Sequence, residues 1–427
     1  MPNGAATAHL FRPKLITTLT EGAYDLAALR QDILAALTVA IVALPLSMAI
    51  AVASGVSPER GLYTSIVGGF LVSALGGSRY QIGGPAGAFI VLVAATVARF
   101  GLEGLLLTVL MSGIMLTLVG VSRLGSLIRH IPHAVTVGFT SGIAVTILAS
   151  QIRDFAGLRL AHPEPGPLIP KLAALTQAAH AFTPAALAIG VGAAALIFVI
   201  RRFRPTWPGM LIAVVVTSAA AAGLPLGVET IGSHFGGIPQ ALPAPRLPPV
   251  SLARGLALLP TALSFTLLGG VESLLSAKVA DGMTGRRHRS NMELVAQGLA
   301  NIASALFGGI SVTGTIARTA TNVRAGARSP LAGMMHAGFV LLFLLVAAPM
   351  ARFIPLSALA GVLVVVCWNM AEKTEFARLL KRPGSAAVLL TTFGLTLARD
   401  LTTGIIAGCL LAAFLALINR PVPEEGD

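Results

Sequence analysis

The sequence predicts an all-α polytopic membrane protein with fourteen transmembrane segments, and three observations support this fold class. Of the 427 residues, 55% are hydrophobic and only 11% are charged, whereas soluble domains carry about 25% charged residues. Apolar runs of about twenty residues recur from Gln31 to Leu417, and each run is long enough to cross a bilayer. The 46 glycines and 26 prolines suit spanning helices, which use small residues for close packing and tolerate interruptions.

The apolar runs fall into two sets of seven, separated by a connector rich in proline and polar residues. A second such connector follows the fifth run and contains an amphipathic stretch, Ile169–Phe182, which is expected to lie on the surface. The chain therefore divides into an N-terminal segment (1–30), a first repeat (31–223), a connector (224–253), a second repeat (254–420) and a tail (421–427). The predicted segments are Gln31–Ala53, Gly61–Leu75, Gly84–Ala98, Leu102–Val121, Pro132–Gln151, Pro184–Ile200, Trp207–Gly223, Leu256–Val279, Asn291–Phe307, Thr315–Gly326, Pro330–Met350, Pro355–Met370, Ala386–Ala398 and Thr402–Ile418.

The formal net charge of +13 has two explanations, nucleic-acid binding and the cytoplasmic excess of Lys and Arg in membrane proteins. The basic residues occur singly or in short clusters between apolar runs, without interleaved aromatic residues, and this favours the second explanation. With the N-terminus inside, the inside connectors hold 19 Lys and Arg residues and the outside connectors hold 9. The bias predicts fourteen spans with both termini in the cytoplasm. We expect a location in the cell inner (plasma) membrane and no nucleic-acid partner.

The two sets of seven carry matching motifs at equivalent positions. Ser73–Gly77 closes the second segment and Ser304–Gly309 closes the ninth, and each is followed by a short non-helical stretch. Since seven is odd, two such repeats must be inverted with respect to the membrane, as in many secondary transporters.

The third and tenth segments differ from the others, because each begins with a loose stretch and is too short to cross the bilayer alone. Gln81–Ala88 contains Pro85, a residue that suits the first turn of a helix, and Gly308–Thr315 precedes a helix expected over Ile316–Ala325. Irregular backbone at membrane depth is tolerated only beside protein or a wet cavity. An inverted repeat would bring the two helix N-termini together near the midplane, where their free N–H groups form a site for an anion.

Arg318 falls in the first turn of the predicted tenth helix, at membrane depth. Inserting a charged side chain there costs at least about 2.5–3.5 kcal/mol, so the residue needs a role that offsets this cost. Its guanidinium can bind a carboxylate, sulfate or bicarbonate through two parallel hydrogen bonds. The alternative is an ion pair with Glu272 that locks two helices together, and the two roles can alternate between states.

Glu272 lies midway along the eighth segment, and an intramembrane carboxylate is a functional candidate by default. A carboxyl group in a low-dielectric site can take up a proton near neutral pH, so Glu272 could carry a symported proton, bind Na⁺ or neutralise Arg318. In the first segment, Pro45 is expected to break the helix. The freed carbonyls and Ser47 would then face the ligand; the alternative is that the proline kink serves only helix packing. Phe89 either walls the same pocket or packs.

No stretch of the sequence is typical of an enzyme. The eight histidines lack metal-ligand spacing, and no nucleophile triad, P-loop or cofactor motif is found. We therefore expect no catalytic residue, no metal and no cofactor.

On these residues, the chain resembles the sulfate permease (SulP) family, which includes the solute carrier 26 anion exchangers, over about residues 28–420. The most specific stretch is Thr315–Val323, continued by Gly326–Pro330, in the second repeat. In the first repeat the resemblance rests on Ala43–Ala49, Ser57–Tyr63, Gly76–Arg79 and Gly83–Pro85.

The resemblance implies two inverted repeats, with segments one to four and eight to eleven in a core domain and the remaining segments in a gate domain. It implies that the core moves past the gate as an elevator and carries an anion between the third and tenth helices. Glu272 falls where coupled members place an acidic residue. By position, the residues implied at the anion site are Ala86, Gly87, Ala317, Arg318 and, in the same motif, Thr319.

Two departures from the family pattern bear on the substrate. Many members have Gln after the first-span proline and Ser before the tenth-helix arginine, whereas this chain has Leu46 and Ala317, and the loss of these polar groups disfavours sulfate. The pattern resembles bacterial members that take dicarboxylates, which implies proton-coupled symport of fumarate or succinate. Sodium–bicarbonate symport and sulfate transport are the alternatives within the family, and an anion channel is the alternative of another class.

Members of the family usually carry a cytoplasmic STAS domain after the last span, whereas ten residues follow Leu417 here. The sequence is therefore expected to be either a truncated chain or a member without that domain. The expected partners are a small anionic substrate, a proton or Na⁺ as coupling ion, the lipid bilayer and, with no interface assigned, a second copy in a homodimer.

Overall fold

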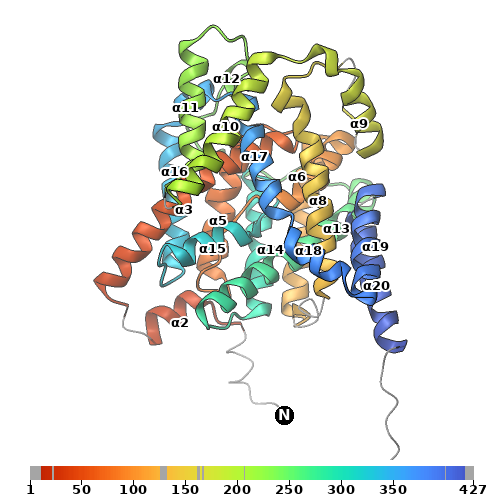
Figure 1. Cartoon of the computed structure of the whole chain (residues 1–427). Helices are drawn as coiled ribbons and strands as arrows, with labels where there is room; N and C mark the ends of the chain where they lie inside the picture. The colour runs from red at the N-terminus through yellow and green to blue at the C-terminus, as the bar shows by residue number, and fades with distance from the viewer. Residues whose placement is uncertain are drawn as a thin grey trace, which may run out of the picture.

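The computed structural model describes residues 11–21, 24–125, 132–160, 164–165, 168–205, 207–399 and 401–418. Within these ranges the chain is mainly helical, with one two-stranded sheet (Figure 1). The predicted tail, 421–427, and the first ten residues of the predicted N-terminal segment lie outside the described ranges.

Each of the fourteen predicted segments contains helix. In the first half the elements are α2 (Lys14–Glu21), α3 (Leu26–Ala53), α4 (Pro58–Tyr63), the π-helical turn η1 (Thr64–Gly68), α5 (Gly69–Leu75), β1 (Gly83–Gly84), the 3-10 turn η2 (Gly87–Phe89), α6 (Ile90–Val121), α8 (His133–Ala156), α9 (Leu168–Gln177), η3 (Ala179–Ala181), α10 (Pro184–Phe203) and α11 (Gly209–Gly223). In the second half they are α12 (Ile231–Phe235), α13 (Leu252–Thr284), α14 (Ser290–Leu306), β2 (Thr313–Gly314), α15 (Ile316–Arg324), α16 (Leu331–Val346), η4 (Ala348–Phe353), α17 (Leu356–Met370), α18 (Lys373–Leu380), α19 (Pro383–Ala398) and α20 (Leu401–Ile418).

Several helices have the length and apolar surface that a bilayer requires. Large apolar side chains such as Val216, Leu263 and Leu342 are more than half exposed on the outside of the protein, as expected for groups that face lipid rather than water. The chain is therefore a multi-pass membrane protein, and the fourteen crossings stay a prediction. Among the described residues, six helices are long and apolar enough to span: Leu26–Ala53, Gly87–Val121, His133–Ala156, Pro184–Phe203, Leu252–Thr284 and Leu356–Leu380.

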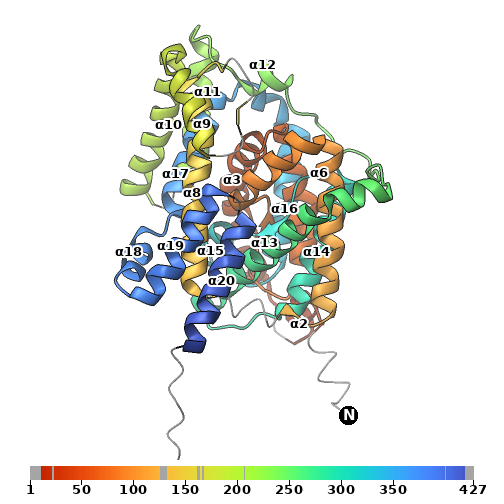
Figure 2. The same ribbon diagram turned by 90° about the vertical axis from the view of Figure 1, so that its right-hand side faces the viewer.

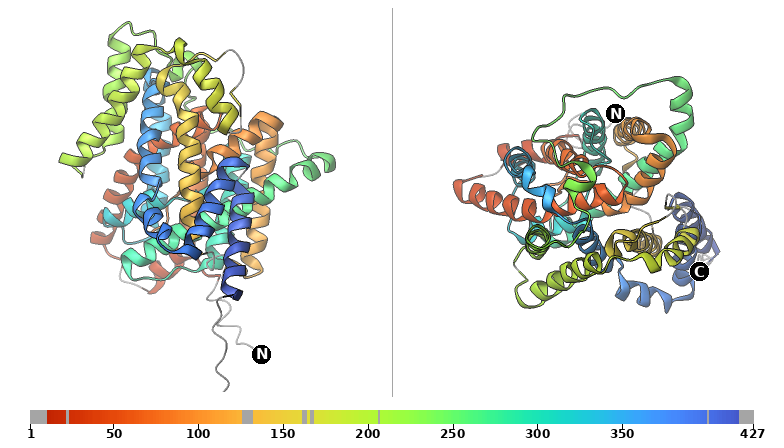
Figure 3. Two further views of the ribbon diagram at one scale, coloured as in Figure 1. Left: turned by 45° about the vertical axis from the view of Figure 1, so that its right-hand side comes forward. Right: turned by 90° about the horizontal axis from the view of Figure 1, so that it is seen from above.

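The helices pack in two groups, which lie beside each other when the protein is seen from above (Figure 3). In the first helix group, α6 packs along α13 and α14, α16 packs along α3 and α5, and α15 lies against α13 and α3 (Figure 2). In the second helix group, α8 packs on α17 and α19, α10 packs on α17 and α11, and α20 packs on α19. Contacts of α3 with α17 and α11 join the two groups. Segments far apart in the sequence therefore build each group together.

Two local predictions are wrong. Pro45 does not break the first span, because α3 continues through it to Ala53; the residues around it are buried against neighbouring helices, which is the setting in which spanning helices tolerate proline. Pro85 does not stand in the first turn of a helix. It follows the extended pair Gly83–Gly84, which is held in β1, and the helical turn begins only at Gly87.

The third and fourth predicted segments join within one element, α6. Its helical path is interrupted at Gly101, whose φ of 70° is a conformation that glycine adopts without strain. The interruption lies between the end of the third predicted segment, at residue 98, and the start of the fourth, at residue 102. The predicted position of this break agrees with the structure.

The two-stranded sheet lies at the centre of the first helix group and positions the starts of η2 and α15. β1 and β2 run antiparallel, with Gly83 opposite Gly314 and Gly84 opposite Thr313. Each strand lies directly before a helix start, η2 followed by α6 in one case and α15 in the other. The crossing of the strands therefore holds two helix N-termini side by side.

Candidate functional site

The two helix N-termini that follow β1 and β2 form the centre of the candidate site. Their N-cap residues, Ala86 and Thr315, make no side-chain capping bond, so backbone N–H groups of both first turns lack a side-chain acceptor. The Thr315 hydroxyl is also buried and has no hydrogen-bond partner. Unpaired donors and two helix dipoles directed to one place create a site suited to an anion.

Arg318 lies directly behind these helix starts and is 1% exposed. Its Nη2 donates to Ser47 Oγ at 3.1 Å and to the Pro85 carbonyl at 3.2 Å, and its Nη1 donates to Ser65 Oγ at 3.4 Å. The hydroxyls of Ser47 and Ser65 also bond each other at 2.8 Å. The guanidinium therefore connects α3, η1 and the segment before η2, and it contributes positive charge from within the protein.

The absence of a side chain at Gly84 makes room for this guanidinium. A Cβ atom built on Gly84 would lie far inside contact distance of Arg318 Nη1 and 3.2 Å from Ser65 Oγ. The φ of Gly84 is not in the left-handed region, so its backbone conformation does not require glycine. The close approach of the Arg318 guanidinium does.

Glu272 lies on α13 and is half-buried, and its Oε2 atom is inaccessible and has no hydrogen-bond partner. Among the described residues, no ion pair joins it to Arg318, so the structure does not contain the helix-locking pair. The part of α13 that carries Glu272 is bonded to β2 and to α15. Ser273 Oγ and Thr313 Oγ1 are 2.7 Å apart, and Ser276 Oγ donates to Thr319 Oγ1 at 3.1 Å.

The remaining predicted site residues separate into two sets by their surroundings. Ala317 is exposed at the start of α15, and Gly87 is half-buried and faces the second helix group, since a Cβ built on it would lie 3.8 Å from Ile147 Cδ1 and 3.9 Å from Met370 Sδ. Gly87 therefore borders the space between the groups.

The second set forms a frame behind the helix starts. Phe89 is 1% exposed and packs edge-on against Phe265, with ring centroids 5.4 Å apart. Thr319 is fully buried, and its hydroxyl accepts a hydrogen bond from the Ile82 N–H at 3.2 Å. Ala86, Pro45 and Ser47 are also buried. In this conformation these side chains hold the site together, and none of them faces open space.

Sequence reasoning missed three polar residues of this region. Thr315 and Ser65 lie in polar or small-residue stretches that gave no reason to single them out. His336 lies in α16, fully buried, and both of its ring nitrogens lack a partner. A lone ionisable residue in an apolar run is itself a signal, and it could have identified His336.

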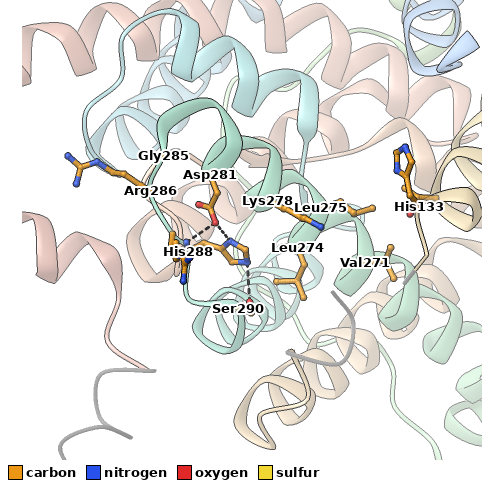
Figure 4. Close-up of a pocket in the computed structure, with 12 residues that line it drawn as sticks. His133, Val271, Leu274, Leu275, Lys278, Asp281, Gly285, Arg286, His288 and Ser290 are labelled. Carbon is orange, nitrogen blue, oxygen red and sulfur yellow. Dashed lines mark hydrogen bonds and ion pairs between the residues drawn. The ribbon is translucent and has the colours of Figure 1, made fainter. Parts of the chain in front are cut away.

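A cavity of about 660 Å³ opens between the two helix groups (Figure 4). It is lined by one side of α13 from Val271, the neighbour of Glu272, to the loop after that helix, and by His133 of α8. Its cations are Lys278, Arg286 and Arg287, while its carboxylate, Asp281, is bonded to His288 Nδ1 at 2.6 Å. Excess positive charge in a cleft raises the local concentration of anions.

Residues 29–392 match the model of the sulfate permease family. A Bacillus subtilis protein named "Putative sulfate transporter YvdB" is 44% identical over 399 residues, which cover 93% of this chain and 75% of that protein. The bicarbonate transporter BicA of Picosynechococcus sp. is 32% identical over 408 residues, which cover 91% of this chain and 70% of BicA.

Solved structures agree with this relationship. The transmembrane domain of a cyanobacterial bicarbonate transporter BicA superimposes with a TM-score of 0.78 at 28% identity, covering 91% of this chain and 98% of that domain. SLC26A9 superimposes with a TM-score of 0.88 at 18% identity, covering 97% of this chain and 69% of SLC26A9, which shows the common fold. The chain is therefore a membrane transporter of small anions that belongs to the sulfate permease family.

Proposed function

We propose that this protein is a secondary active transporter that takes up a C4-dicarboxylate, such as fumarate or succinate, together with protons. The observation that carries the proposal is the position of Arg318, a fully buried charge directly behind two facing helix N-termini. In a low-dielectric setting a fixed positive charge and preorganised N–H donors attract an anion strongly. The lack of polar side chains at Leu46 and Ala317 is the reason for preferring a dicarboxylate.

The anion is held by the helix starts rather than by the guanidinium itself. Both Nη atoms of Arg318 are bonded within the protein, while its buried Nε has no partner among the described residues; its part is to supply charge and to brace the frame. The direct contacts are backbone N–H groups at Gly87 and Ala317 and the unpartnered hydroxyl of Thr315. Such donors bind an oxyanion by geometry and field, and they suit carboxylate, sulfate and bicarbonate alike.

The transport motion that we propose is an elevator, in which the first helix group is the core and the second is the gate. Antiparallel pairing of β1 with β2 supports the inverted arrangement of two seven-segment repeats. Gly87 faces Ile147 and Met370 across the boundary between the groups, and the cavity along α13 opens at that boundary. With fourteen spans and both termini cytoplasmic, the cavity with its three cations is the cytoplasmic path of the anion.

Replacing Arg318 with alanine tests the proposal. The variant is expected to bind fumarate at least about tenfold more weakly, since a hydrogen-bonded buried charge contributes about 1.5–3 kcal/mol. The measurement is a binding and liposome-uptake screen on purified protein with fumarate, succinate, sulfate and bicarbonate, the last with and without Na⁺. Arg254→Ala is the control, because among the described residues the side chain of this exposed arginine pairs with Glu103 alone, at 3.4 Å. An Arg318→Ala protein that binds every anion as well as wild type contradicts the assignment.

Replacing Glu272 with glutamine tests the proton coupling. In wild-type liposomes, an inward proton gradient is expected to accelerate fumarate uptake, because protonation of Glu272 removes a negative charge near the incoming anion. The glutamine keeps the shape and stays neutral at every pH, so the acceleration should fall by about fivefold or more. Glu103→Gln changes an exposed carboxylate on α6 and should leave the acceleration by the proton gradient unchanged. Uptake by wild type that ignores the gradient would refute the coupling without affecting the anion site.

A further inference from the structure

A second cavity, of about 530 Å³, has no part in the proposed transport. It is lined by the C-terminal end of α8 and the loop after it, by α12 and the segment before that helix, and by the starts of α10 and α17. The helix α8 connects the cavity along α13, which His133 lines, with the second cavity, which Arg153 lines. These residues are about 30 Å apart along the helix, the thickness of the apolar part of a bilayer. The second cavity therefore lies near the opposite face of the membrane, at the end of the molecule that carries α12 (Figure 1).

Ser357 lines the second cavity from the first turn of α17 and carries two unused hydrogen-bond donors. The residue is 3% exposed, and among the described residues neither its N–H nor its hydroxyl has a partner. Buried polar groups are nearly always paired, because leaving them unpaired is costly. The N-cap of α17, Pro355, offers no side-chain acceptor. Both donors are therefore available to a ligand in the cavity, and the helix dipole at this position favours a negatively charged one.

The carboxylates around the second cavity do not exclude an anion. Each of the three that line it contacts a basic side chain: Asp154 with Arg153 at 2.8 Å, Glu164 with Lys171 at 2.9 Å and Glu229 with His234 at 3.5 Å. The first two are thus neutralised within the wall, and the side chain of Glu229 is 71% exposed, so that water screens its charge. Arg159 also lines the cavity, and among the described residues its exposed side chain has no hydrogen bond or ion pair. A free guanidinium can bind an oxyanion through two parallel hydrogen bonds.

We propose that the second cavity is a binding site for a small oxyanion, of the carboxylate class, separate from the Arg318 site. The N–H and the hydroxyl of Ser357 donate to the bound anion from the buried side, and Arg159 binds it from the exposed side. The proposal does not depend on which anion the protein transports. It assigns a role to the buried donors of Ser357, which have no partner within the described part of the chain.

An anion in the second cavity joins the ends of two helices of the second helix group. Arg159 belongs to the segment that continues α8, and Ser357 belongs to the first turn of α17. The two helices pack along each other, and they carry Ile147 and Met370, the residues that Gly87 faces beside the Arg318 site. A ligand that binds only the folded state raises its stability. Occupancy of the second cavity is therefore expected to stabilise the helix pair that borders the first anion site.

Hydrogen exchange of the purified protein in detergent, resolved by peptide, tests the second site. The probe is succinate, compared with chloride at equal ionic strength, and the background is Arg318→Ala, in which the first anion site is weakened. We expect succinate to slow exchange in the first turn of α17 by about threefold or more, since a ligand bound there suppresses local opening. Adding Arg159→Gln and Ser357→Ala together should abolish this protection. In a protein with Arg318 intact, the same pair of changes should remove protection at α17 and leave it at the start of α15.

Controls separate ligand binding from a structural role of the same residues. Alanine removes a buried hydroxyl that has no partner among the described residues, so Ser357→Ala without succinate should melt at or above the wild-type temperature. Ser141→Ala removes another buried hydroxyl without a partner, on α8, and Arg246→Gln changes another exposed arginine. Neither residue lines the second cavity, so both variants should keep the protection at α17.

Three outcomes overturn the proposal. The first is exchange in the first turn of α17 that succinate does not slow at any concentration, and the second is protection that persists without Arg159 and the Ser357 hydroxyl. The third is a Ser357→Ala protein that melts well below wild type without succinate, because its hydroxyl would then be bonded within the protein. None of these outcomes affects the Arg318 site, which undiminished anion binding by Arg318→Ala refutes instead.

Discussion

Changing Gly84 to alanine is expected to reduce fumarate uptake by at least about 100-fold, which corresponds to about 2.8 kcal/mol. The added methyl group would occupy the place of Arg318 Nη1, and Ser65 Oγ at 3.2 Å blocks the other side. The guanidinium must then leave its bonds to Ser47, Ser65 and the Pro85 carbonyl within the buried frame. The expected effect exceeds that of removing Arg318, because a displaced buried charge is costlier than an absent one.

The measurement is uptake of labelled fumarate by liposomes containing equal amounts of protein, with elution as a single peak from size exclusion as the check on folding. Gly192→Ala is the matched control, since a Cβ on Gly192 in α10 has no atom within 4 Å. That variant should transport as wild type does. A Gly84→Ala protein with normal uptake would show that the position of the guanidinium is unimportant.

Changing Asp32 to alanine is expected to destabilise the fold by about 3–5 kcal/mol. Asp32 is fully buried near the start of α3, and its carboxylate accepts hydrogen bonds from the Arg328 N–H at 2.6 Å, the Ser329 N–H at 3.2 Å and the Ser329 hydroxyl. The Tyr24 hydroxyl donates to it at 2.7 Å. The carboxylate thus ties α3 to the turn between α15 and α16, and alanine would leave several buried donors unpaired.

The measurement is thermal unfolding of the purified protein in detergent, followed by tryptophan fluorescence. Asp25→Ala is the matched control, because this exposed aspartate caps the same helix by accepting from the Ala28 N–H at 2.8 Å, a contact worth about 1 kcal/mol. The fall in melting temperature should be at least about threefold larger for Asp32→Ala. Similar shifts for the two variants would show that the buried cluster contributes little.

The Tyr24 contact gives this contribution a dependence on pH in the alkaline range. Burial, followed by the hydrogen bond to Asp32, raises the pKa of Tyr24 from 10.0 to about 12. A group whose pKa is higher in the folded state contributes its stability fully below its unfolded pKa, and loses it as the pH rises through the folded value. The difference between Asp32→Ala and wild type should therefore be constant up to pH 10 and shrink towards pH 12.

The sequence pattern was sufficient to predict those features of the molecule that depend on local composition, namely the positions of the helices and of the buried arginine. Apolar runs and their interruptions located the helices because a bilayer imposes a length and a hydrophobicity on every crossing. Arg318 was identified because inserting a charged side chain at membrane depth has a high free-energy cost. The start of the tenth helix at residue 316 was also predicted correctly.

The same reasoning failed where neighbouring elements override local preference. Proline at positions 45 and 85 gave wrong helix boundaries, because packing around α3 and pairing of β1 with β2 determine the backbone there. Asp32 went unnoticed, because its role depends on partners in elements distant in the sequence. Membership of the anion-transporter family followed from the motifs and was confirmed by the comparisons.

By itself, the sequence determined that this is a helical membrane protein of the sulfate permease family with a costly arginine at one helix start. Composition and spacing suffice for that, because the cost of burying a charge in an apolar segment does not depend on the fold. Only the tertiary structure decided what the arginine contacts. The crossing of β1 and β2 brings residues more than 200 positions apart into hydrogen-bond distance, and Arg318 bonds to Ser47, Ser65 and Pro85. No local pattern encodes such a contact, since it arises only when both halves of the chain have folded together.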